Sequence, residues 1–237
     1  MNVTELLNDL AIGELSNLSM AEGNTILPAK VPQIIKYANE GLLRLYTKFL
    51  LKENDLILET RVGTTYYHLL KRFAYSQYDE SNPPAEWDMP YIMDLGKEPF
   101  KEDVIKVLGV YDFNGVAVPL NDTEQRRSVF TPQALMLQVP NPRDGETLSV
   151  QYQAKHDVIP VTDYSDIVIT LPEVLRSALN AYIASKVYMH MNTAETTAKG
   201  QEHSIIYEVL CQDAIDMDLV STSSSTTNTK FQIRGWK

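Results

Sequence analysis

The chain has 237 residues, 44% of them hydrophobic, which is enough for one large domain or two small ones with a sizeable core. Asp and Glu number 31 against 21 for Lys and Arg, so the formal charge is −10, which argues against a general affinity for nucleic-acid phosphate. No basic segment followed by an apolar one opens the chain, and no apolar run approaches the roughly 20 residues that span a bilayer, so we expect neither a secretory signal nor a membrane span.

The first part of the chain predicts two helices. A short one can be capped by Thr4 and ends near Gly13. A longer one begins at Pro32, a residue suited to a first helical turn. Its apolar residues recur at spacings of three and four, as on one helix face: Ile35, Ala38, Leu42, Leu45 and Phe49. We therefore expect an amphipathic helix of roughly 20 residues packed against a partner.

The middle of the chain favours strands. Six strand candidates follow one another: 56–62, 64–67, 104–111, 116–120, 134–139 and 147–153. Asn114-Gly115 between two apolar runs is the strongest short signal for a hairpin, and the link 140–145 is equally rich in turn residues. Residues 54–165 thus predict a compact antiparallel β unit inserted between helices.

Helical patterns resume after this region. The sequence from Thr170 to Glu173 matches a capping box, and the helix that it opens should run to about Met191. Its expected inner face consists of Leu171, Leu175, Ala178, Tyr182, Ser185 and Met189. A second start signal lies at 192–195. The inner face predicted for that last helix consists of Ile206, Leu210, Ala214 and Met217. The two helices should form an antiparallel hairpin.

The last 17 residues have a different chemistry. Eight of the nine residues 221–229 are Ser or Thr, which is linker composition, and residues 230–237 then combine two aromatic residues and an isoleucine with three cations. An extended peptide of this kind can add to the sheet edge of another subunit, although folding back on its own domain is the alternative. The predicted partner-binding residues are Lys230, Phe231, Gln232, Ile233, Arg234 and Trp236.

These elements predict an α+β fold: a helical bundle core of three long helices plus a short N-terminal one, with an inserted antiparallel β unit and an extended C-terminal tail. The predicted domain limits are 1–53 with 166–220 for the helical core, 54–165 for the β-rich insertion, and 221–237 for the flexible linker and docking tail.

Signatures of catalysis are missing from the sequence. It contains no Gly-x-Ser-x-Gly turn, phosphate loop, His-Glu-x-x-His or Cys-x-x-Cys. The four histidines, His68, His156, His190 and His203, stand apart, and the nearest approach to a ligand pair is His203 beside Glu202, which a solvated helix surface explains better. The single cysteine, Cys211, should be a buried thiol of a protein that folds in a reducing cytoplasm. We expect no enzyme, no cofactor and no metal.

Three further groups have a functional and a structural interpretation. An acidic cluster could hold calcium, but its spacing fits no EF-hand, and a solvated or partner-facing loop is the alternative: Asp79, Glu80, Glu86, Asp88 and Asp94. Arg126 and Arg127, next to Glu124, could grip a phosphate or form local ion pairs. Four aromatic residues could stack on a ligand, or belong to a core or an interface: Tyr66, Tyr67, Trp87 and Tyr91.

The order of elements resembles the head-to-tail adaptor (connector) proteins of short-tailed, podovirus-type bacteriophages. The residues that carry the resemblance are Val3-Thr4-Glu5-Leu6-Leu7, the helix start Pro32-Gln33-Ile34-Ile35-Lys36-Tyr37-Ala38-Asn39, the helix from Leu171-Pro172-Glu173 to Tyr188, and the extended end. The resemblance covers most of the chain and consists in the order of the elements.

The resemblance implies a structural virion protein of the neck or tail, made in the host cytoplasm. Such proteins form a homo-oligomeric ring, typically of twelve copies, beneath the portal protein, and their helical bundles surround the DNA channel. DNA would pass without sequence-specific binding, and the C-terminal extension would reach the portal or a neighbouring subunit. The β unit would face the tail tube or nozzle and fibre proteins.

Two other classes remain open at this point. Another tail, baseplate or decoration subunit would form a trimer or hexamer instead of a larger ring. A small enzyme or ligand-binding module would have a deep pocket lined by ionisable groups with perturbed pKa values.

Overall fold

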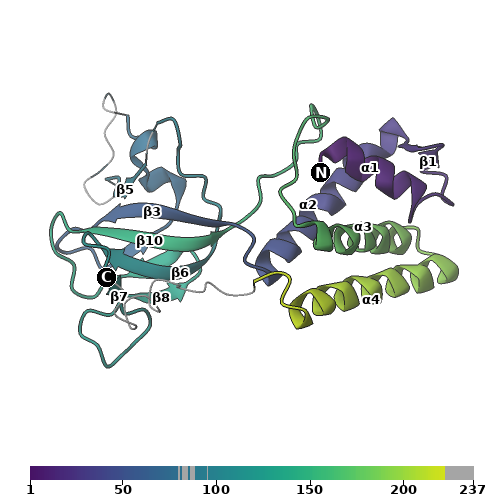
Figure 1. The fold of residues 1–237 in the computed structure, drawn as a ribbon. Helices are drawn as coiled ribbons and strands as arrows, with labels where there is room; N and C mark the ends of the chain where they lie inside the picture. Colours follow the sequence, from purple (N-terminus) through teal and green to yellow (C-terminus); the bar gives the residue numbers. More distant parts are fainter. Residues whose placement is uncertain (80, 82–84, 86–88, 95, 222–237) are drawn as a thin grey trace, which may run out of the picture. The chain divides into compact units, whose positions relative to one another are not determined.

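A computed structural model describes residues 1–79, 81, 85, 89–94 and 96–221 (Figure 1). Within these residues the chain forms four α-helices and three antiparallel sheets, of five, three and two strands. Its contacts divide it into two compact units. The helical unit consists of Met1–Leu51 and the described residues from His156 onward, and the β unit consists of Lys52–Lys155.

The helical unit begins with α1 (Val3–Ile12), which is capped by Asn2. Asn2 Oδ1 accepts a hydrogen bond from Glu5 N at 2.7 Å, and Glu5 Oε2 accepts one from Asn2 N at 2.9 Å, which is a capping box. The predicted cap, Thr4, lies inside the helix, and its hydroxyl donates to Ser165 O instead. After α1 come a small hairpin of β1 (Ala21–Glu22) and β2 (Thr25–Ile26) and a 3-10 turn, η1 (Pro28–Lys30).

Helix α2 (Val31–Lys48) confirms the apolar stripe read from the sequence. All five predicted core positions are buried: Ile35, Ala38, Leu42, Leu45 and Phe49. The opposite side of the helix leaves Lys36, Leu43 and Arg44 exposed. The charged and apolar residues of α2 therefore separate as the period of an amphipathic helix requires.

Helix α3 (Arg176–His190) is the most enclosed helix of this unit, with buried residues around its whole circumference. It follows a 3-10 turn, η5 (Glu173–Leu175), and the capping box predicted at Thr170 is wrong. Pro172 has extended backbone angles, so the helix begins after it, and Thr170 O accepts a hydrogen bond from the hydroxyl of Tyr46. The predicted inner position of Met189 is also wrong, since this side chain is exposed.

Helix α4 (Ala194–Asp216) packs along α3 by a face of which the sequence analysis predicted only Ala214. Its buried residues are Gly200, Tyr207, Cys211 and Ala214. Ile206 and Met217 were predicted to lie inside, but they are 39% and 66% exposed. The reason is size: a Cβ added to Gly200 would lie 2.7 Å from Met189 Cγ and 3.1 Å from Ser185 O, so α4 approaches α3 through its small residues.

The close approach at Gly200 gives a test of this packing. We expect Gly200→Ala to lower the free energy of unfolding by about 1–3 kcal/mol, because the added methyl group forces α3 and α4 apart by overpacking. Gln201→Ala, at the exposed neighbouring position, is the matched control and should leave stability unchanged or slightly raised. Urea denaturation followed by circular dichroism measures both, and equal stability of the two variants would contradict the close contact.

The β unit is built around a five-stranded sheet in the order β5-β3-β10-β6-β7. Its strands are β3 (Glu53–Glu59), β5 (Ile92–Met93), β6 (Val104–Asp112), β7 (Ala117–Val118) and β10 (Thr147–Ala154). A three-stranded sheet in the order β4-β9-β8 contains β4 (Tyr66–His68), β8 (Phe130–Gln133) and β9 (Met136–Gln138). Two 3-10 turns, η2 (Lys71–Phe73) and η3 (Tyr75–Gln77), lie between β4 and β5.

The hairpin predicted at Asn114-Gly115 is confirmed. β6 and β7 pair with Val110 opposite Val118, and Gly115 adopts a φ of +74°, a left-handed conformation that favours glycine. The turn-rich link 140–145, by contrast, connects two sheets. β9 pairs with β4 and β8, whereas β10 lies between β3 and β6.

The predicted core of three long helices is wrong. The β content is substantial, and the strands bury a hydrophobic core of their own that includes Leu58, Tyr67, Ile92, Leu137 and Val150. Both larger sheets contribute to this core, Leu58 and Val150 from the five-stranded sheet and Tyr67 and Leu137 from the three-stranded one. The molecule is therefore an α+β protein of two units with separate cores, and the β unit is no appendage of a helical bundle.

Candidate interaction surfaces

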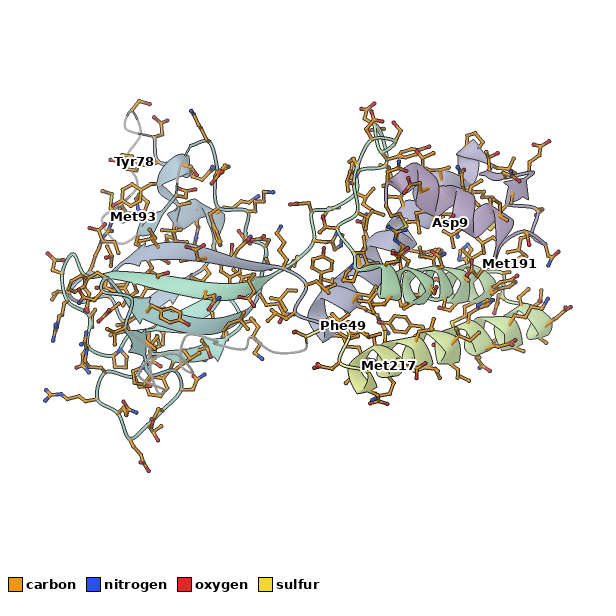
Figure 2. All side chains as sticks on the ribbon, in the orientation of Figure 1. Asp9, Phe49, Tyr78, Met93, Met191 and Met217 are labelled. Atoms are coloured by element: carbon orange, nitrogen blue, oxygen red, sulfur yellow. The ribbon has the colours of Figure 1, made fainter. Side chains whose placement is uncertain are left out.

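The first candidate surface is the outer face of α4, formed by Ile205, Ile206 and Val209. Tyr207 and Cys211 point to α3, and a helix turns by about 100° per residue, so Ile205 and Val209 point away from it. They are 65% and 51% exposed. Figure 2 shows the side chains of α4 projecting on both sides of the helix, toward α3 and away from it. Three aliphatic side chains clustered on one exposed helix face are typical of a protein–protein contact.

The outer face of α4 has an acidic rim. Glu202, Asp213 and Asp216 are exposed around the three aliphatic residues. Glu208 is paired with Lys48 of α2 at 2.8 Å, and Lys199 is paired with Glu195 at 3.7 Å. These exposed pairs contribute little to stability, on the order of 0–1 kcal/mol each. A partner of this face should therefore combine apolar and basic side chains.

The exposed face of α2, formed by Lys36, Leu43 and Arg44, has that combination. Leu43 leaves its aliphatic side chain in solvent, and the Arg44 guanidinium lies 5.3 Å from the centre of the Tyr182 ring. The ring holds Arg44 at the surface of the unit, where its positive charge remains accessible. The faces of α2 and α4 thus differ in charge, and each exposes aliphatic surface, one leucine on α2 and three residues on α4.

The second candidate surface is a groove of about 660 Å³ in the β unit, lined by β3, β5, the segment 97–103 and Tyr152. A buried carboxylate, Asp103, organises one end of it. The Tyr152 hydroxyl donates to Asp103 Oδ1 at 2.9 Å, Asn54 Nδ2 donates to Asp103 Oδ2 at 3.2 Å, and Lys52 Nζ lies at 3.7 Å. Burial, and after it the charge of Asp103, raises the pKa of Tyr152. The network satisfies a buried charge and makes this end of the groove rigid.

Asp94 fixes the loop that forms the other side of the groove. Its carboxylate accepts hydrogen bonds from Ser76 N at 2.8 Å, from Ser76 Oγ at 2.5 Å and from Phe100 N at 2.8 Å. Partial burial acts to raise the pKa of Asp94, but these hydrogen bonds outweigh it, so the pKa lies below its usual value. Asp94 therefore has a structural role as an ionised acceptor.

The other members of the acidic cluster give no metal site in the described part of the chain. The Asp79 carboxylate accepts from Ser81 N and Oγ, and Glu80, Glu86 and Asp88 lie outside the described residues. In the ranges that the structure describes, no three His, Cys, Asp or Glu side chains are grouped so that they could hold a metal ion.

The remaining sequence candidates have structural partners. Arg127 pairs with Glu146 at 2.9 Å, an ion pair between residues 19 positions apart and not with the neighbouring Glu124. The Tyr91 hydroxyl donates to His68 O. His203 stacks on the ring of Tyr188, 5.4 Å between centres.

The aromatic candidates and the cysteine are mostly core residues. Tyr67 and Tyr91 are buried and pack edge to face at 5.1 Å, as expected for core aromatics. Tyr66 is half-exposed, and Trp87 lies outside the described residues. Cys211 is buried, as predicted, and burial raises the pKa of its thiol, which makes it unreactive.

The predicted docking peptide lies outside the described residues, which end at Ser221. All six predicted site residues belong to it: Lys230, Phe231, Gln232, Ile233, Arg234 and Trp236. The structure therefore leaves their role as a prediction. It does place the start of the segment, because Leu50 N donates a hydrogen bond to Ser221 O at 2.8 Å.

Sequence reasoning missed the outer face of α4. The predicted residues Ile206, Leu210, Ala214 and Met217 recur at helical spacing, but the residues that face α3 do so as well: Gly200, Tyr207, Cys211 and Ala214. The available signal for the buried face was Gly200, seven residues before Tyr207, because a close contact between helices needs a small residue.

In the described helices, no segment has both the length and the apolar content to cross a bilayer. Comparison with known proteins adds no family: no family model matches the chain, and no curated protein matches it.

Proposed function

We propose that this chain is a structural virion protein, a ring-forming head-to-tail adaptor that joins a portal to a tail and surrounds the path of the DNA. The observation that carries the proposal is the exposed aliphatic face of α4, Ile205, Ile206 and Val209, together with the complementary exposed face of α2. A protein that works by assembly needs such faces, because the burial of apolar surface drives association.

The two faces differ, and this favours a ring. When one copy uses its α4 face against the α2 face of the next copy, the open assembly keeps one unused face of each kind, at its two ends, until it closes. Glu202 and Asp213 at the rim of α4 would then lie near Lys36 and Arg44 of the neighbour. Such rim charges favour the head-to-tail pairing over contacts between two acidic α4 faces.

The charge of the chain suits a channel for DNA. A net charge of −10 per copy adds up around a ring, and an acidic wall lets the phosphate backbone slide instead of holding it by counterion release. DNA would pass without sequence-specific binding. The tail residues Lys230–Lys237 would dock on the portal or on a neighbouring copy, and the β unit would meet tail tube, nozzle or fibre proteins.

Electron microscopy of the purified full-length chain, with its mass in solution, tests the proposal. The expected result is a closed ring of many copies with a central opening, and antibody labelling of virions should place it between the capsid vertex and the tail. Trimers or hexamers would support another tail or baseplate subunit instead. A chain that stays monomeric at high concentration and is absent from virions would contradict both.

A further inference from the structure

β5, the edge strand of the five-stranded sheet, is too short to cover β3, so in the described residues part of β3 has no pairing strand on that side. β5 has two residues and pairs only with Ile57 and Leu58 of β3. Glu59 N donates to Tyr91 O across this edge, so alternate residues of β3, among them Asp55 and Glu53, also direct their N–H and C=O groups toward it. Among the described residues, no strand pairs with these two residues on that side.

The free edge opens into the groove already described, and the groove has an apolar side. Ile57 and Met93 are a cross-strand pair, 44% and 46% exposed, and Phe100 lies beyond them with its ring edge to face with Tyr152. Asp55 and Glu98 are exposed acids at the rim, and Lys97 is an exposed cation there. The edge thus offers unpaired backbone groups next to apolar side chains and carboxylates, which is what a bound strand uses.

We propose that this edge of β3 is the docking site for residues 230–234 of a second copy of the chain, bound as an added strand. Phe231 and Ile233 project to one side of an extended peptide and would lie against Ile57 and Met93. The proposal rests on the proposed function in one respect, because it needs a neighbouring copy.

The positive charge of the C-terminal tail favours residues 230–234 as the occupant of this edge. Residues 222–237 contain Lys230, Arg234 and Lys237 and no acid, a charge of +3, so the rest of the chain carries −10 − 3 = −13. The tail is therefore attracted to the acidic surface of any copy. Its apolar residues alternate with polar ones, which suits one buried and one solvated side of an added edge strand.

The linker is long enough for the tail to reach a neighbouring copy. The described chain ends at Ser221, whose carbonyl is bonded to Leu50 N, three residues before β3 begins at Glu53. A short turn after Ser221 would be enough for the chain to return to its own β3. The Ser/Thr-rich residues 221–229 instead span about 15–18 Å as a flexible linker, a reach that suits a second copy.

Cysteine cross-linking in the full-length chain tests the pairing. The variant Asp55→Cys with Ile233→Cys, two positions on the same face of the proposed pairing, should form disulfide-linked dimers and larger species under mild oxidation, and reductant should reverse them; the native Cys211 is buried and does not interfere. The matched control is Val62→Cys with Ile233→Cys, since Val62 is exposed in the same unit but lies beyond the other end of β3, seven residues after Asp55. A disulfide formed within one chain, equal cross-linking of the control, or no cross-linking would each overturn the proposal.

A peptide experiment separates this proposal from ring formation. A fluorescent peptide of residues 229–237 is titrated into the full-length variant Ile205→Asp/Val209→Asp, whose α4 face cannot assemble, and anisotropy should report binding. Adding Asp55→Pro should weaken binding by roughly tenfold or more, because proline removes an outward N–H that β10 does not use.

Ring formation and peptide binding are separate results, and one can occur without the other. Peptide binding without rings would overturn the proposed function and support the strand site. Rings without peptide binding would overturn the strand site and leave the proposed function standing.

Discussion

Replacing Ile205 and Val209 together with aspartate is expected to abolish the contact between α4 and α2 of neighbouring copies, and with it ring assembly, and to leave the fold intact. Both side chains are more than half exposed, so their removal takes nothing from the core. In an assembled contact the two aspartates would be desolvated next to Glu202 and Asp213, which are already acidic. Loss of about 1.5–3 kcal/mol per buried aliphatic side chain predicts a dissociation constant raised by roughly 100-fold or more.

Sedimentation velocity over a range of concentrations measures this effect, and thermal melting checks the fold. The matched control is Val158→Asp, a substitution of the same kind at an even more exposed position of the helical unit outside the helices. It should change neither assembly nor stability. Unchanged assembly of the double variant would remove α4 from the interface, and a lowered melting temperature would show that the two residues belong to the core.

A mixing experiment tests whether the contact is head to tail. Leu43→Asp blocks the exposed face of α2 and leaves α4 intact, whereas the double variant blocks α4 and leaves α2 intact. Neither variant should assemble alone. Mixed in equal amounts they should form heterodimers and nothing larger, because one intact face of each kind remains. Homodimers of the Leu43→Asp variant would show instead that two α4 faces meet each other.

The contrast between α2 and α4 shows how far the sequence can predict such faces. In α2 the charged residues leave a single apolar stripe, so its buried face could be read directly. In α4 aliphatic residues occupy two sides, and the buried side is chosen by Gly200 and Cys211, which allow α3 to come close. Periodicity alone cannot choose between two apolar faces. Ile206, wrongly predicted as core, belongs for that reason to the candidate interface on the outer face.

The β unit shows a second limit of sequence reasoning. The local hairpin at Asn114-Gly115 could be predicted, because its turn residues and its strands are adjacent. The pairing of β10 with β3 brings together residues such as Val150 and Leu56 that are far apart in the chain, and no local signal specifies it. For the same reason the separate core of this unit and the free edge of β3 became visible only in the folded chain.

Deletion of residues 222–237 is the second large effect that we expect. The truncated chain should keep its melting temperature and its free energy of unfolding within about 0.5 kcal/mol. The cut after Ser221 retains the Leu50 N–Ser221 O hydrogen bond and the buried Val220. Docking between copies, by contrast, should be lost, because the residues that would add to β3 are gone.

A full-length variant separates loss of the docking residues from loss of length. Phe231→Ser, Ile233→Ser and Trp236→Ser together keep the linker and the three cations, and should weaken assembly as much as the deletion does. Lys237→Ala should have little effect, since apolar anchors in a pocket contribute more to binding than charges at its rim. Sedimentation measures the assembly of the deletion, the triple serine variant and Lys237→Ala, and thermal melting measures their stability. If truncation lowers the melting temperature by several degrees, the aromatic residues of the tail pack on their own subunit, and neither the portal nor a neighbouring copy is needed to explain them.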